Sequence, residues 1–156
     1  MKSEDKSNIS DHLNEYDFKK LKIKFLDKDE IKIFSTLCQD GIISIDEIIY
    51  NKSDKILIAT FSRFCWEFVG KKLKDETFYR VVSGIRICNV NRINYLNKDK
   101  VGFTKFINLL SVENLKNEII LNFSLDITIE LLVENIEIYL DDLDMPWPTV
   151  KKPMHK

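Results

Sequence analysis

Apolar residues recur at every second position along much of this chain, and this period limits the folds that it can adopt. Near its start, Leu21, Ile23 and Phe25 alternate with lysines. A two-residue period places apolar side chains on one face of an extended strand and polar side chains on the other. We therefore expect a protein made mainly of antiparallel strands, whose first strand ends near Leu26.

One variation of this period occurs three times, in the segments 43–48, 85–90 and 131–136. In each segment the apolar positions keep their parity at first and then shift by one residue. A β-bulge accommodates such a shift, because two residues of the bulged strand face one residue of its partner. Each segment has a neighbouring apolar strand, so the pattern predicts bent hairpins. The neighbouring strands are expected at 55–61, 103–110 and 119–123.

The connections between these strands also favour hairpins. Segments 51–54 and 124–126 are short and turn-prone, and 71–76 is a charged loop. The segments 56–61 and 106–110 carry apolar residues on both faces, so we expect two central strands that are covered on both sides.

A single helix is predicted directly after the first strand. Asp27 and Glu30 have the spacing of a capping box, whose side chains bond to backbone N–H groups at a helix start. The apolar residues of 31–38 then fall on one helical stripe. We expect Gly41 to end this helix.

Together these elements predict an α+β protein. We expect a mostly antiparallel β-sheet, or a partly open barrel of about seven strands, with one helix after the first strand. The segment from Leu132 to Leu143 fits both a strand and a helical face. Strand is favoured, because Ile, Val and Tyr suit a pleated surface. The alternative is a pleckstrin-homology-like barrel with a C-terminal helix.

The chain of 156 residues fits one domain that folds without disulfides or metals. Residues 1–18 are polar and follow no period, so we expect a disordered N-terminal arm. Residues 19–145 then form the single α+β domain. Residues 146–156 form a proline-rich extended tail.

Charge and cysteine usage narrow the classes of partner and location. The 24 basic and 25 acidic residues leave a formal charge of -1, so a nucleic-acid partner is not expected. Cys38, Cys65 and Cys88 form no CxxC pair, which predicts reduced thiols and no disulfide framework. No apolar run approaches the ~18 residues that a membrane span needs. We therefore expect no membrane partner and a cytoplasmic location, and the oligomeric state stays open.

Arginine occurs only four times in a lysine-rich chain, so each arginine marks a place where a planar five-donor group is favoured over a simple positive charge. On an extended strand Arg63 and Glu67 share one face, and Trp66 lies on the other. This pair either forms a surface ion pair beside an aromatic core strand or holds a ligand. We retain Arg63, Trp66 and Glu67 as candidate binding residues.

The other three arginines lie close together in the sequence. Arg80, Arg86 and Arg92 would share one face of an unbroken strand, as a row suited to phosphate or carboxylate. The bulge expected near Cys88 separates Arg92 from the other two. An ordinary row of solvated charges is the alternative. Arg86 is retained as a candidate binding residue.

All three prolines lie in the C-terminal segment from Met145 to His155, on both sides of Trp147 and further on. This stretch must be extended, and it cannot join a central strand. Trp147 therefore either folds back onto the domain or presents an aromatic anchor to a partner. Trp147 and His155 complete the candidate binding residues.

Catalytic equipment is sparse in this sequence. His12 and His155, the two histidines, lie in the terminal segments, and there is no phosphate-binding glycine loop. Cys65 has no neighbouring base, and the acidic cluster at 141–144 is interpreted as solvated. We predict no catalytic residue, no metal and no cofactor, and whether the protein is an enzyme stays open.

Several short motifs occur in a recognisable order. They are Arg63-Phe64 with Trp66-Glu67, Ser83-Gly84-Ile85-Arg86, Leu109-Leu110, Val133-Glu134 with Ile136, Asp142-Leu143, and Pro146-Trp147-Pro148-Thr149 with Pro153 and His155. In order and spacing they resemble the domain of unknown function 2948 (DUF2948) family of small bacterial proteins. The resemblance runs from about Leu21 to His155. Because the family is uncharacterised, it implies no catalytic residue.

The chain departs from this family pattern at three places. Ser124-Leu125-Asp126 replaces a glycine-rich turn, Asn135 replaces a small residue, and the segment before Lys19 is extra. The first departure implies that the turn serves the fold and does not bind a phosphate.

The leading hypothesis is a non-enzymatic cytoplasmic binding or accessory module that contacts a protein partner. It would use the strand around Trp66 and the Pro-Trp-Pro tail, and it follows from the lack of acid-base groups beside an aromatic, extended segment. The alternative is an enzyme or small-anion sensor with an Arg/Glu site on the sheet. That site would consist of Arg63, Glu67, Arg80 and Arg86.

Overall fold

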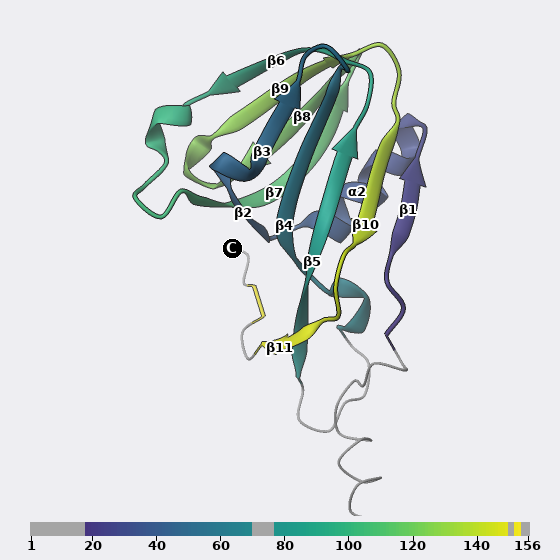
Figure 1. Cartoon of the computed structure of the whole chain (residues 1–156), viewed down its shortest axis with the longest axis vertical. Coiled ribbons are helices and arrows are strands. Elements are labelled where there is room, and N and C mark those ends of the chain that lie inside the picture. The colour runs from purple at the N-terminus through teal and green to yellow at the C-terminus, as the bar shows by residue number, and fades with distance from the viewer. Residues whose placement is uncertain (1–17, 70–76, 150–151, 154–156) are drawn as a thin grey trace, which may run out of the picture.

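The computed structural model describes residues 18–69, 77–149 and 152–153. These residues form eleven strands, one α-helix and five short 3-10 turns (Figure 1). The expected count of about seven strands is wrong, because several strands have only three or four residues and carry too few alternations to be separated by pattern. The strands are β1 Lys22–Phe25, β2 Gly41–Ser44, β3 Ile48–Asn51, β4 Ile56–Phe64, β5 Phe78–Ile87, β6 Val90–Leu96, β7 Phe106–Leu115, β8 Glu118–Phe123, β9 Thr128–Val133, β10 Ile138–Asp142 and β11 Trp147–Thr149. The helix is α2 Ile31–Cys38, and the 3-10 turns are η1 Lys28–Glu30, η2 Ile45–Glu47, η3 Trp66–Phe68, η4 Lys98–Lys100 and η5 Ser124–Asp126.

The strands form one antiparallel sheet in the order β1-β10-β5-β4-β2-β7-β8-β9-β6. In addition, β3 pairs with β4, and β11 pairs with β5. The end strands β1 and β6 do not pair with each other, so the sheet curls without closing into a barrel. The prediction of a mostly antiparallel sheet with one helix after the first strand is confirmed.

Helix α2 covers one face of the sheet only. In Figure 1 it lies behind β5 and β10, and no helix of the described residues lies on the near face of these strands. Phe34 of α2 packs against Phe25 of β1, with ring centroids 5.2 Å apart, and both side chains are buried. The Val112 backbone N–H of β7 donates a hydrogen bond of 2.9 Å to Ser35 Oγ of the helix. The main core therefore lies between α2 and the inner face of the curled sheet.

The start of the helix follows the expected capping pattern. Asp27 Oδ1 accepts a hydrogen bond of 3.1 Å from the Glu30 backbone N–H, and Glu30 Oε1 accepts one of 2.6 Å from the Leu26 N–H. The end differs from the prediction. Asp40, with φ 63°, takes the left-handed conformation that Gly41 was expected to supply, and Gly41 already belongs to β2. The helix therefore ends without a glycine cap.

The three parity shifts mark strand ends and not the predicted bulges. The first shift is turn η2. At the second, Asn89 has φ 60° and turns the chain from β5 into β6, and at the third the chain leaves β9 at Val133 and enters β10 at Ile138. Both a bulge and a turn change the parity of the apolar positions, so the pattern alone does not distinguish them. The irregular registers are at Val90/Arg92 of β6 and Leu109/Ser111 of β7.

The segment from Leu132 to Leu143 contains the end of β9 and all of β10, so the favoured strand is confirmed and the C-terminal helix of the alternative barrel is absent from these residues. Strands β4 and β7 are central, as predicted, but their outer faces are only partly covered. Ile58 of β4 is 45% exposed and Phe106 of β7 is 57% exposed.

Two expectations fall wholly or partly outside the described residues. The charged loop at 71–76 lies outside them, and so do residues 1–17 of the expected arm. Phe18, the last residue of that arm, is buried in a second, smaller cluster with Cys65, Tyr79 and Val81. Among the described residues, no helix has both the length and the apolar character needed to cross a membrane.

Candidate functional site

Strand β4 carries Arg63 into the interior of the protein. Leu57, Ala59 and Phe61 occupy alternate positions of β4 and are buried, and Arg63 continues this parity with no exposed surface. The strand ends at Phe64, and turn η3 brings Glu67 back toward Arg63. Arg63 and Glu67 therefore meet through a turn and not, as predicted, along one strand face.

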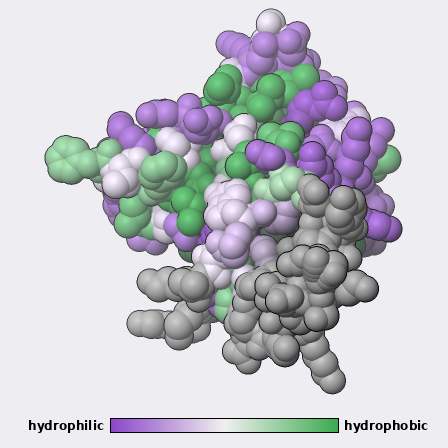
Figure 2. All heavy atoms as spheres, turned by 60° about the horizontal axis from the view of Figure 1, so that its bottom comes forward, coloured by the Kyte–Doolittle hydropathy of each residue, from purple (hydrophilic) through white to green (hydrophobic). Residues whose placement is uncertain are grey.

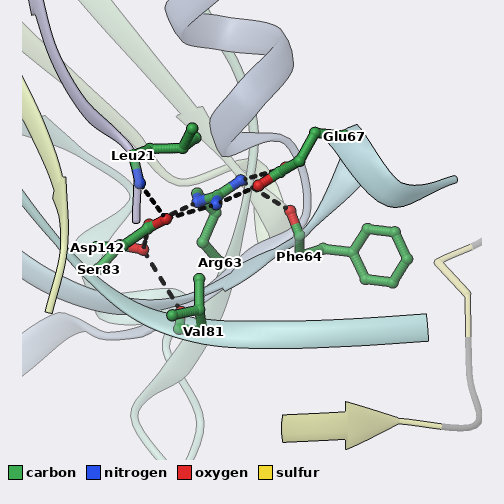
Figure 3. A network of polar contacts seen from close by, with 7 residues as sticks. All are labelled: Leu21, Arg63, Phe64, Glu67, Val81, Ser83 and Asp142. Carbon is green, nitrogen blue, oxygen red and sulfur yellow. Dashed lines mark hydrogen bonds and ion pairs between the residues drawn. The ribbon is translucent and has the colours of Figure 1, made fainter. Parts of the chain in front are cut away.

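The guanidinium of Arg63 lies between two carboxylates (Figure 3). Its Nε and Nη2 donate to Asp142 Oδ1 and Oδ2 at 3.1 and 3.0 Å. Its Nη1 and Nη2 donate to Glu67 Oε1 and Oε2 at 2.9 and 2.8 Å. The second Nη1 proton faces the Phe64 carbonyl at 3.4 Å. An arginine has five N–H donors, so none is left for a ligand in this arrangement.

Asp142 joins this network to two further segments. Its Oδ1 accepts a hydrogen bond of 2.7 Å from Ser83 Oγ, and its Oδ2 accepts one of 2.8 Å from the Leu21 backbone N–H. Burial on its own lowers the pKa of Arg63, but the hydrogen bonds and charges of Glu67 and Asp142 outweigh it and raise that pKa above its usual value. Arg63 is therefore a permanently charged internal group that links β4, β5 and β10.

A surface ion pair between Arg63 and Glu67 was one expectation, and the structure instead buries Arg63 completely. Asp142 was not predicted as the second partner of Arg63, although the sequence carries a signal for it. Ile138, Leu140 and Asp142 alternate along β10 and are all buried, so Asp142 occupies an inward position of an otherwise apolar strand. A charge at such a position in each of two strands indicates a buried ion pair.

A different set of side chains faces outward at the end of β5. Trp147 of β11 and Phe64 of β4 lie opposite Arg80 on its two sides, so the three residues form one cross-strand row. The Trp66 ring packs edge-on against Phe64, with centroids 4.5 Å apart. Trp147 is 40% exposed, whereas Phe64 is buried. We name the outward group of Trp66, Phe78, Arg80 and Trp147 the Trp147 surface.

Hydrogen bonds to the backbone hold the Trp147 surface in place. Arg80 Nη1 donates to the carbonyls of Ser62 and Asp40 at 3.0 and 3.2 Å. Trp66 Nε1 donates to the Gln39 carbonyl at 2.7 Å. Figure 2 turns this end of the molecule forward and shows pale residues of intermediate hydropathy at its centre. The tail therefore folds back through its main chain, and the Trp147 ring stays partly open to solvent.

The remaining arginines lie elsewhere. Arg86 is six residues from Arg80 on β5, a distance of roughly 20 Å along a strand. Its guanidinium carbon lies 4.2 Å from the centroid of the Tyr139 ring, over which Lys24 also lies at 5.5 Å. Arg92 is on β6.

The structure thus brings Trp66, Arg80 and Trp147 together, keeps Arg63 and Glu67 in the internal network and leaves Arg86 apart. His155 lies outside the described residues.

The described cysteines are poorly suited to nucleophilic chemistry. Burial raises the pKa of Cys65 to about 12, with smaller contributions from neighbouring charges, and burial also raises the pKa of Cys38. A thiol with such a pKa is almost entirely protonated at neutral pH. Within the described parts of the chain, no three His, Cys, Asp or Glu side chains are grouped to hold a metal ion.

Comparison with known proteins gives one match. A family model with the description "Protein of unknown function (DUF2948)" covers residues 21–155, nearly the whole chain. Neither a curated protein nor a solved structure matches.

Proposed function

This chain belongs to the DUF2948 family, whose description assigns no activity, and we propose that it is a non-enzymatic binding module that contacts a protein partner through the Trp147 surface. The observation that carries the proposal is that Trp147 has a fixed backbone position and a partly exposed side chain. Strand β11 fixes its backbone opposite Arg80, yet 40% of the residue is exposed. A large aromatic side chain that is both fixed and exposed suits an interface anchor.

The residue types of the Trp147 surface support a protein partner. Tryptophan and arginine are enriched among the residues that dominate binding energy at protein interfaces. Arg80 is already fixed by two carbonyls, and Trp66 by one. A partner that binds fixed side chains loses less conformational entropy than one that must order them.

The adjoining sheet face extends this surface. Leu143 is 53% exposed and lies over Gly84 of β5, where an added Cβ would be 3.5 Å from Leu143 Cδ1. Because α2 lies on the opposite side of β5 and β10, no helix covers this face in the described residues (Figure 1). Exposed apolar residues beside fixed aromatics favour a macromolecular partner.

The apolar core formed by the described residues offers little room for a small-molecule ligand. An apolar cavity of about 20 Å³ lies in the core, between Ile43, Phe61 and Leu121 among others. Such a volume corresponds to about one water molecule, whereas small-molecule sites measure about 300 Å³ or more. This contrast supports a surface-binding role over an enclosed ligand site.

Affinity purification with the tagged full chain tests the proposal. Trp147→Ala should abolish retention of the proteins that the wild type retains, because it removes the anchor. Leu115→Ala is the matched control, since Leu115 is 58% exposed but lies at the far end of β7. With a purified partner, Trp147→Ala should weaken binding at least about tenfold by calorimetry.

Circular dichroism of each variant verifies that the fold is kept. Identical sets of retained proteins for wild type and a folded Trp147→Ala variant would contradict the proposed role of this surface. Equal losses with Leu115→Ala would also contradict it, because the effect would then not be specific.

A further inference from the structure

Strand β6 is an open edge of the sheet beyond its irregular register at Val90/Arg92. It has seven residues, and among the described residues it pairs only with β9 (Figure 1). At its start, the Val90 N–H donates to the Lys55 carbonyl at 2.8 Å, and Tyr50 Oη donates to the Val90 carbonyl at 2.7 Å. Beyond Val90, the outward edge of β6 has no backbone hydrogen bond to any residue that the structure describes. Its free N–H and C=O groups can pair with another strand.

The opposite edge of the sheet is protected by the usual means. Strand β1 has only four residues, and two of them are the exposed lysines Lys22 and Lys24. Short length and lysine side chains both discourage strand addition. Strand β6 contains neither lysine nor proline. Of the two end strands, β6 is therefore the one that can accept a further strand.

The inner side of β6 gives a second reason to add a strand. Ile93 and Tyr95 pack against the core but are only half-buried. A strand placed along β6 would shield both side chains from water. Apolar surface removed from water stabilises the association.

The outer side of β6 carries an arginine that has no side-chain partner among the residues that the structure describes. Arg63, Arg80 and Arg86 each contact a carboxylate, a carbonyl or a ring, whereas Arg92 makes no such contact within the described chain. Arg92 lies in an open groove of about 240 Å³ together with Glu118 and Glu130. The groove therefore holds a free cation and two carboxylates on neighbouring strands.

From this edge and these charges, we propose that β6 is a homodimer interface at which it pairs antiparallel with β6 of a second copy about a two-fold axis at Ile93. In that register Arg92 lies opposite Asn94 of the second copy. Asn94 lies opposite Glu130 in the β6–β9 register, and Asn94 Nδ2 already donates to Glu130 Oε1 at 2.9 Å.

The Cα atom of Arg92 in one copy is then two strand spacings from the Cα atom of Glu130 in the other, a distance of roughly 10 Å. Long arginine and glutamate side chains span that separation. Two-fold symmetry makes both ion pairs at once, so the charges select a second copy over an unrelated strand. A pairing along this one short strand buries less surface than a permanent dimer needs, so dimerisation should depend on protein concentration.

Sedimentation velocity of the full chain over a range of concentrations tests the dimer. The wild type should show a reversible monomer–dimer equilibrium. Arg92→Glu alone and Glu130→Arg alone should each raise the dimer Kd at least about tenfold, because like charges then face each other. Glu113→Arg is the control, since it reverses an exposed glutamate of β7, which β8 and β9 separate from β6.

Mixing the two single variants distinguishes contacts between copies from contacts within one copy. Arg92→Glu and Glu130→Arg should form a heterodimer, because each altered charge then faces its opposite across the interface. A contact within one chain cannot be repaired by mixing. A wild type that is monomeric throughout, or a dimer that both single variants leave unchanged, would overturn the proposal.

Oxidative cross-linking tests the register independently. In a Cys88→Ser background, Ile93→Cys should form an intermolecular disulfide, since residues opposite each other on antiparallel strands have a Cα separation that a disulfide can span. Leu115→Cys, which is exposed and lies on β7, three strands away from β6, should not form one. Equal cross-linking of both variants would overturn the pairing at Ile93.

Discussion

Leu125 and Asp126 both adopt left-handed backbone conformations in turn η5, with φ 63° and 59°. In that region the Cβ of an L-residue lies too close to the following carbonyl oxygen, and only glycine avoids this cost. Leu125 is 52% exposed, so its side chain recovers little through burial. The backbone of this turn therefore favours glycine. This preference accounts for the glycine-rich turn of the DUF2948 pattern without a role in ligand binding.

Leu125→Gly should raise the free energy of unfolding by roughly 0.5–1 kcal/mol, because it removes the left-handed strain at one residue. Urea denaturation followed by circular dichroism measures the change. Leu115→Gly, at a similarly exposed position in the extended strand β7, should instead destabilise by roughly 0.5–1 kcal/mol. If both substitutions destabilise equally, backbone strain at Leu125 is not the relevant cost.

At the scale of elements, the join between α2 and β2 depends on a close approach. A Cβ at Gly41 would lie 2.4 Å from Phe61 Cδ2 and 3.0 Å from the Cys38 carbonyl oxygen. Phe61 is buried, so its ring cannot swing into solvent. Glycine is required here for packing, whereas Asp40 supplies the turn.

Gly41→Ala should lower the free energy of unfolding by about 1–3 kcal/mol, since the Phe61 ring must move within a packed core. Gly102→Ala is the matched control, because an added Cβ there meets no atom within 4 Å. That control should stay within about 0.5 kcal/mol of the wild type. Thermal and urea unfolding together give both values. A neutral Gly41→Ala would show that the junction can relax without cost.

At the scale of the whole molecule, Asp142 connects segments that are far apart in the chain. It bonds to Leu21, Arg63 and Ser83, whose positions differ from its own by 121, 79 and 59 residues. These contacts join β4, β5 and β10 to the residue that precedes β1. A buried charge left without its partner is costly, so this network couples the N-terminal and C-terminal ends of the sheet.

Asp142→Leu should destabilise the protein by about 3–5 kcal/mol, because Arg63 would lose its one fully buried carboxylate partner among the described residues. Adding Arg63→Met should recover part of that loss, since two apolar residues replace the ion pair. Glu134→Ala, which breaks the exposed contact of 3.5 Å with Lys55, should change stability by less than about 1 kcal/mol. A double variant no more stable than Asp142→Leu would contradict this account.

Local patterns were sufficient for much of the fold. The capped helix after β1, the turn at 51–54 and the strand between 138 and 142 follow from side-chain periods and turn chemistry within a few residues. The expected number of strands was too low. Strands of three or four residues, such as β11, carry too few alternating positions to be recognised by pattern, and only their pairing with another strand defines them. The predicted bulges are turns in the structure. The prediction was wrong because a bulge and a turn produce the same parity shift in the sequence.

The candidate site was less accessible to sequence reasoning. Arg63 and Trp66 were noticed because of their residue types, but their roles depend on Asp142 and on β11, which reach β4 and β5 only after folding. Arg80 was expected to share a site with Arg86, and the extended length of β5 separates them.

By itself, the sequence determined which residues are extended, which form the one helix and which alternate positions face inward, since each depends on neighbours along the chain. Only the tertiary structure decided that Arg63 meets Asp142, that Trp147 lies opposite Arg80 and that β6 is left as an open edge. These features depend on which strands become neighbours. The packing of the whole sheet determines strand order, and no single segment of the sequence encodes it.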